Sequence, residues 1–108
     1  MRERFLSNLG LARRAGNVAF GFDACARAVQ AGEASCVFCS ADAAENTRKR
    51  MERICAGQGA EMLYIPFSLQ EIGRATGRKD TALFVVTDQG LMELLKRSLE
   101  DRNGGNAE

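Results

Sequence analysis

Short apolar runs alternate with longer segments of helical periodicity along the whole chain, and this alternation restricts the possible folds more than any other feature. The four runs lie at residues 18–20, 36–39, 62–65 and 82–86. Continuous apolar runs of this length suit strands that are covered by helices on both faces. Strands that alternate with helices predict an α/β fold with a central, mostly parallel sheet.

The segments between the runs carry helix signals. The apolar spacing predicts helices over residues 2–15, 22–31 and 43–57, a short helix ending near Gly77, and a last helix capped by Thr87 or Asp88. Asp42 with Glu45, and Ser68 with Glu71, have the spacing of a capping box, in which two side chains satisfy backbone N–H groups at a helix start. These signals set the expected starts of the third and fourth helices.

The chain of 108 residues is long enough for one domain, which we expect over residues 1–100. Residues 101–108 include Asn-Gly-Gly-Asn, offer no core contacts, and predict a disordered tail. The first five residues lack the apolar core of a signal peptide, and the apolar runs are too short to cross a bilayer. We therefore expect a cytoplasmic protein with no membrane partner, most simply a monomer.

The charges are unevenly distributed, although the net charge is only +1. The first 32 residues contain five arginines and two acidic residues, whereas residues 51–108 contain seven basic and nine acidic residues. This asymmetry allows one basic face on a nearly neutral body, which is compatible with a polyanionic partner.

Several classes of catalytic site are poorly supported by the residues. The chain has no histidine, no Gly-x-Gly-x-x-Gly motif and no phosphate-loop lysine motif. Cys36 and Cys39 have redox-motif spacing, but on a strand their side chains point to opposite faces, which favours inert packing over a disulfide, metal ligation or a thiol enzyme. We expect a non-catalytic protein without a cofactor, a metal or a small-molecule substrate.

The segment from Gly16 to Arg27 is the first candidate binding site. Gly21 precedes the second predicted helix, where free backbone N–H groups attract phosphates, and Arg27 projects from the solvent face one turn later. The alternative is that Arg27 only pairs with Asp23 four residues before it, which would stabilise the helix.

Other cations are candidates, and each also has a possible structural role. Arg78 and Lys79 lie in the loop before the last strand, where they could serve binding or only solubility. Arg13 and Arg14 close the first helix, where cations also favour the helix C-terminus. The run at 48–50 wraps around its helix and is more typical of a solvated face.

Several segments stand in a particular order along the chain, namely residues 9–16 (LGLARRAG), Gly21, residues 28–32 (AVQAG), 42–47 (DAAENT), 69–77 (LQEIGRATG) and 86–88 (VTD). Taken together, from about residue 5 to residue 96, they resemble the YlxQ-type bacterial branch of the L-seven-Ae ribosomal protein superfamily. No piece is specific alone, and the specificity lies in their order and separation.

The resemblance implies a three-layer α-β-α sandwich around a four-stranded mixed sheet. It also implies binding of structured RNA, namely rRNA or another kink-turn-like RNA, through the turn before the second helix, the start of that helix and the loop before the last strand. A kink-turn is a sharply bent helix–bulge–helix element with tandem sheared G·A pairs. With the two arginines of the first helix, the expected RNA-binding residues are Gly21, Phe22, Asp23, Arg27, Arg13, Arg14, Arg78, Lys79 and Thr81.

Two functions follow from these expectations. The first is a ribosome- or translation-associated RNA-binding protein. The second is a protein–protein interaction module on the same fold, which gains support because Asp23-Ala24 stands where kink-turn binders carry Asn-Glu. Exposed rings of Phe20 or Phe22 at the would-be RNA site would favour the second function, because bare apolar surface suits a protein anchor better than a phosphate.

Overall fold

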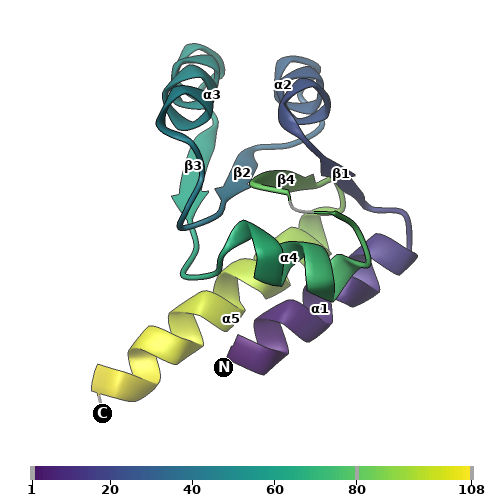
Figure 1. Cartoon of the computed structure of the whole chain (residues 1–108), viewed down its shortest axis with the longest axis vertical. Coiled ribbons are helices and arrows are strands. Elements are labelled where there is room, and N and C mark those ends of the chain that lie inside the picture. The colour runs from purple at the N-terminus through teal and green to yellow at the C-terminus, as the bar shows by residue number, and fades with distance from the viewer. Residues whose placement is uncertain (1, 80, 108) are drawn as a thin grey trace.

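A computed structural model describes the backbone at residues 2–79 and 81–107 and the side chains at residues 4–79 and 81–99. Helices and strands alternate as the sequence predicts (Figure 1). In chain order the elements are α1 (Arg2–Arg14), β1 (Val18–Phe20), α2 (Phe22–Gln30), β2 (Cys36–Cys39), α3 (Glu45–Gln58), β3 (Glu61–Tyr64), α4 (Leu69–Thr76), β4 (Leu83–Val86) and α5 (Gln89–Ala107).

The four strands form one mixed sheet in the order β1-β4-β2-β3. β2 and β3 are parallel, whereas β4 runs antiparallel to both of its neighbours, β1 and β2. The mixed sheet implied by the family resemblance is therefore confirmed, and the mostly parallel sheet inferred from alternation alone is wrong. An apolar run reports that a strand is buried on both faces, but it carries no information about strand direction.

Two apolar cores lie on the two faces of this sheet, which confirms the three-layer sandwich. Along β2, Cys36 and Phe38 join the core beneath α1, α4 and α5, while Val37 and Cys39 join the core beneath α2 and α3. In Figure 1, α2 and α3 lie above the sheet and the other three helices lie below it. Stacked rings add to the lower core, with centroids 5.0 Å apart for Phe38 and Phe84.

The predicted inert role of the cysteines agrees with their surroundings. All four are buried free thiols, and Cys36 and Cys39 lie on opposite faces of the sheet. Burial raises the pKa of Cys25 and Cys36 to about 12 and that of Cys39 to about 11. Because the thiolate is the nucleophilic form, these cysteines are held in their unreactive state.

One of the two predicted capping boxes is confirmed and the other is wrong. The Ser68 hydroxyl accepts a hydrogen bond from the Glu71 N–H (3.0 Å), and the Ser68 N–H donates to the Glu71 carboxylate (2.9 Å). α3 instead begins after Ala44 without a side-chain cap. The Asp42 carboxylate accepts a hydrogen bond from the N–H of Leu69 (2.8 Å), because the segment after β2 runs beside the start of α4.

The last helix also begins as predicted. The Asp88 carboxylate accepts a hydrogen bond from the N–H of Leu91 (2.9 Å), which makes Asp88 the capping residue of α5. α5 continues to Ala107, across most of the segment 101–108 where the sequence predicts a disordered tail. The side chains of that segment and residue 108 lie outside the described residues, so the tail stays a prediction. Within the described part of the chain, no helix is both long and apolar enough to span a membrane.

Candidate functional site

The turn between β1 and α2 lies at the end of the sheet where β4 begins. The N–H of Gly21 donates to the carbonyl of Leu83 (3.0 Å), which ties this turn to the start of β4. Gly21 has φ 94° and ψ 164°, a conformation that is essentially restricted to glycine. A β-carbon built on Gly21 would meet no atom within 4 Å, so the turn is open on that side.

The first turn of α2 presents backbone N–H groups beside Gly21. The first intrahelical bond runs from the N–H of Cys25 to the carbonyl of Gly21 (3.0 Å), so the N–H groups of Phe22, Asp23 and Ala24 precede it. Such groups, together with the helix dipole, favour an anion. Asp23 is exposed in this turn and is the acidic group nearest to them in the chain.

The loop from Gly77 to β4 is packed against α4. The N–H of Arg78 donates to the carbonyl of Gly73 (2.9 Å), and a β-carbon on Gly73 would lie only 2.8 Å from the Arg78 carbonyl oxygen. The side chains of Arg78 and Lys79 are exposed at the tip of this loop. Thr81 is buried, and its hydroxyl donates to the carbonyl of Leu83 (3.3 Å), so its side chain supports the loop from within.

The structure brings the two predicted segments together through an arginine–aromatic contact. The Arg78 guanidinium lies over the ring of Phe20, with its central carbon 4.5 Å from the ring centroid. Phe20 is the last residue of β1 and directly precedes Gly21. Arg78 therefore reaches the Gly21 turn although the two are far apart in the sequence.

A second arginine at this turn was not among the expected site residues. The guanidinium of Arg50, from α3, lies 4.3 Å from the ring centroid of Phe22. The sequence analysis interpreted the run at 48–50 as a solvated helix face, because its three cations point in different directions. The packing of α3 beside α2 cannot be read from local spacing. The available signal was weak: Arg50 is the one cation of this run with no acidic residue three or four positions away in the sequence.

Arg27 lies on the exposed side of α2, five residues beyond Phe22 and thus about 7.5 Å along the helix axis. The described residues include both Asp23 and Arg27, and no ion pair joins them. Arg27 instead lines an open groove of about 510 Å³ with Ala19 and Thr87, among others. The alternative that Arg27 only pairs with Asp23 therefore receives no support from the structure.

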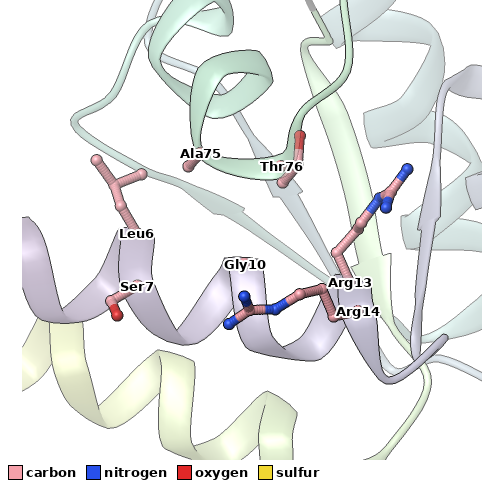
Figure 2. Close-up of a pocket in the computed structure, with 7 residues that line it drawn as sticks. All are labelled: Leu6, Ser7, Gly10, Arg13, Arg14, Ala75 and Thr76. Atoms are coloured by element: carbon pink, nitrogen blue, oxygen red, sulfur yellow. The ribbon is translucent and has the colours of Figure 1, made fainter.

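Arg13 and Arg14 line a second open groove of about 390 Å³ between α1 and α4. Figure 2 shows their side chains diverging, with Arg13 directed toward the side on which Thr76 lies and Arg14 lying along α1. Thr76 ends α4 and is followed by Gly77 and Arg78. Arg13 is thus close in the fold to the element that leads into the Arg78 loop, whereas Arg14 points elsewhere.

Several exposed cations have no carboxylate partner among the side chains that the structure describes. Among the side chains of residues 4–79 and 81–99, the ion pairs join Arg48 to Glu45 and Glu52, Lys49 to Glu45, and Lys96 to Glu61. The cations without such a partner include Arg13, Arg27, Arg50, Arg78 and Lys79. Their charge is therefore available to an external anion, whereas two cations of the 48–50 run are neutralised within α3.

A metal site is not apparent in the described part of the chain, where no cluster of three or more histidine, cysteine or acidic side chains is suitably placed. The arrangement consists of guanidinium and ammonium groups around a helix N-terminus. Groups of this kind are suited to contacts with anions.

The chain matches one protein family over most of its length. Residues 3–96 match the Ribosomal protein L7Ae/L30e/S12e/Gadd45 family, and the chain belongs to it. This confirms the superfamily that the sequence motifs resemble, while the YlxQ-type branch stays a prediction.

Two solved structures are similar to this chain. A protein of unknown function from Bacillus halodurans superposes with a TM-score of 0.82 and 30% sequence identity, covering 90% of this chain and 97% of that one. A 15.5 kDa RNA-binding protein from Giardia lamblia superposes with a TM-score of 0.72 and 17% identity, covering 93% of this chain and 88% of that one. No curated protein matched the chain.

Proposed function

We propose that this chain is a non-catalytic protein that binds structured RNA at the Gly21 turn, the start of α2 and the Arg78–Lys79 loop. The observation that carries the proposal is the contact of Arg78 with Phe20, which joins two segments into one basic surface. Membership of the L7Ae family supports it, as does the fold shared with an RNA-binding protein.

The surface suits the chemistry of folded RNA. Phosphate contacts dominate the recognition of structured RNA, and they come from arginine, lysine and helix N-termini. Arg27, Arg78 and Lys79 have no carboxylate partner among the described side chains, and Gly21 leaves room for the RNA backbone beside the N–H groups of the helix start. Arg13 extends the surface toward the groove between α1 and α4. Thr81 contributes through its backbone and its support of the loop, because its hydroxyl is bound internally.

The proposal extends to the kind of RNA and its setting. The family resemblance of the quoted motifs supports a kink-turn as the RNA that is bound. It also supports a ribosome- or translation-associated role, which we expect the protein to perform as a monomer in the cytoplasm. A kink-turn brings two phosphate strands together at a sharp bend, which matches a surface built from two converging segments. Asp23 and Ala24 provide no side-chain donor to a guanine edge, so we expect the arginines and backbone groups to provide most of the affinity.

The protein-interaction alternative is less well supported by the site. It requires Phe20 or Phe22 to present a bare ring. Both rings are partly buried, and each has a guanidinium over its face. The surface therefore presents positive charge where an apolar anchor would be needed.

The test uses fluorescence anisotropy with a kink-turn stem and with the same stem in which the bulge is fully paired. We expect salt-dependent binding that favours the kink-turn, and each of Arg27→Ala and Arg78→Ala should weaken it by about 1–2 kcal/mol and lower the salt slope by about one unit. Arg97→Ala removes an exposed cation of α5 and is the matched control. The proposal is wrong if the protein has no affinity for either RNA at low salt, or if Arg97→Ala has the same effect as Arg78→Ala.

A further inference from the structure

We propose that Phe20 and Phe22 are platforms that hold Arg78 and Arg50 on the two sides of Gly21, and that Arg50 is a further RNA-contacting residue. This inference rests on the proposed function. It adds a third segment, α3, to the surface, and it assigns a positioning role to two aromatic residues that themselves need not touch RNA.

The two platforms arise from the local chain geometry. Phe20 and Phe22 flank Gly21 in the sequence, and their rings pack against different cores. Phe20 belongs to the side of α1, α4 and α5, where its ring lies 6.3 Å from that of Phe84. Phe22 packs against the core beneath α2 and α3. The glycine turn is therefore bordered by one ring on each face of the sheet.

Each ring carries one guanidinium at a similar distance, 4.5 Å for Arg78 over Phe20 and 4.3 Å for Arg50 over Phe22. The attraction between a cation and a ring face holds the planar group against the ring. The N–H groups project from the edge of that plane, so stacking leaves them free to donate to a phosphate. A stacked arginine also loses less conformational freedom on binding than an arginine that moves freely in solvent.

Charge pairing separates Arg50 from its neighbours in the same run. Arg48 lies 3.4 Å from Glu52, and Lys49 lies 3.0 Å from Glu45. Arg50 is exposed and lies over the Phe22 ring, without a carboxylate partner among the described side chains. Of the three consecutive cations, only Arg50 is both directed to the Gly21 turn and able to accept an external counter-ion.

A double-mutant cycle in the full-length protein, with the kink-turn stem as probe, tests this inference. Arg50→Ala should weaken binding about fivefold to tenfold and lower the salt slope by about one unit. Phe22→Leu should weaken it about threefold with an unchanged slope, because the charge remains and only its positioning is lost. In the double variant, Phe22→Leu should add no further loss.

Two variants keep the cycle interpretable. Lys49→Ala removes the adjacent cation, which is paired with Glu45, and should change affinity by less than about twofold. Arg50→Lys keeps the charge but lacks the planar group, so it should weaken binding about threefold, as expected for Phe22→Leu. It therefore tests the stacking of Arg50 even if Phe22→Leu is poorly folded.

The possible results separate this inference from the proposed function. If the wild-type protein binds the RNA and Arg78→Ala weakens binding while Arg50→Ala does not, the role of Arg50 is refuted and RNA binding stands. If Phe22→Leu weakens binding equally with and without Arg50, the platform is refuted. If Phe22→Leu strengthens binding, the ring sequesters Arg50, and the inference is overturned as well. If the wild-type protein shows no affinity for the RNA, both proposals are refuted.

Discussion

Replacing Gly73 by alanine tests how the Arg78–Lys79 loop is held in place. A β-carbon at Gly73 would lie 2.8 Å from the Arg78 carbonyl oxygen, 3.0 Å from the Lys79 carbonyl oxygen and 3.1 Å from the Lys79 carbonyl carbon. All three are backbone atoms, so no side-chain rotation can relieve the contact. The loop must move away from α4, and Arg78 moves with it.

Opposing contributions set the size of the effect. Alanine in place of glycine within a helix stabilises by about 1 kcal/mol. Overpacking costs about 1–3 kcal/mol, and weakening the bond from the Arg78 N–H to the Gly73 carbonyl costs about 1 kcal/mol more. We therefore expect Gly73→Ala to lower the free energy of unfolding by about 1–3 kcal/mol.

Gly57→Ala is the matched control, because Gly57 lies in α3 and an added β-carbon there would meet nothing within 4 Å. It should raise the free energy of unfolding by about 0.5–1 kcal/mol. Urea denaturation gives both values from the shift of the midpoint at constant m. Gly73→Ala should also weaken RNA binding, because Arg78 leaves its place over Phe20. Equal stabilisation by the two substitutions would refute the packing of this loop against α4.

Three further predictions concern the turn, the thiols and the capping box. Gly21→Ala should lower the free energy of unfolding by about 1–3 kcal/mol, measured by urea denaturation, because alanine rarely adopts φ 94°; an unchanged midpoint would contradict this. Burial raises the pKa of Cys25 and Cys36 from 9.0 to about 12. The free energy of unfolding contributed by the two buried neutral thiols should therefore be fully present below pH 9 and decline as pH rises toward 12. The urea midpoint should be lower at pH 10 than at pH 8. Ser68→Ala should cost about 1 kcal/mol of stability, and Ser68→Asp should restore most of it.

The element order was predictable because it depends on local patterns. The apolar run at 36–39 and the Ser68–Glu71 pair each report a strand or a helix start within a few residues, and the structure confirms both. Long-range pairing is encoded differently. The direction of β4 and its place between β1 and β2 depend on how α4 crosses the sheet, which no local pattern records.

Asp42 shows how a local motif can be redirected by tertiary structure. Its spacing to Glu45 matches a capping box, yet its carboxylate binds the N–H of Leu69, 27 residues away. Both helix starts present free N–H groups, and a carboxylate satisfies whichever group the fold brings within reach. At the start of α4, by contrast, the Glu71 carboxylate accepts the hydrogen bond from the Ser68 N–H of the same helical turn, so the predicted local pairing is kept.

The run at 48–50 shows which part of a binding surface can be predicted from charge alone. Helical geometry turns successive residues by about 100°, so three consecutive cations cannot serve one surface. The acidic residues of α3 neutralise Arg48 and Lys49, as the solvated-face interpretation requires, and Arg50 is left over the Phe22 ring. A net charge of +1 therefore conceals a basic site, because the available positive charge depends on which cations lack partners and not on their number.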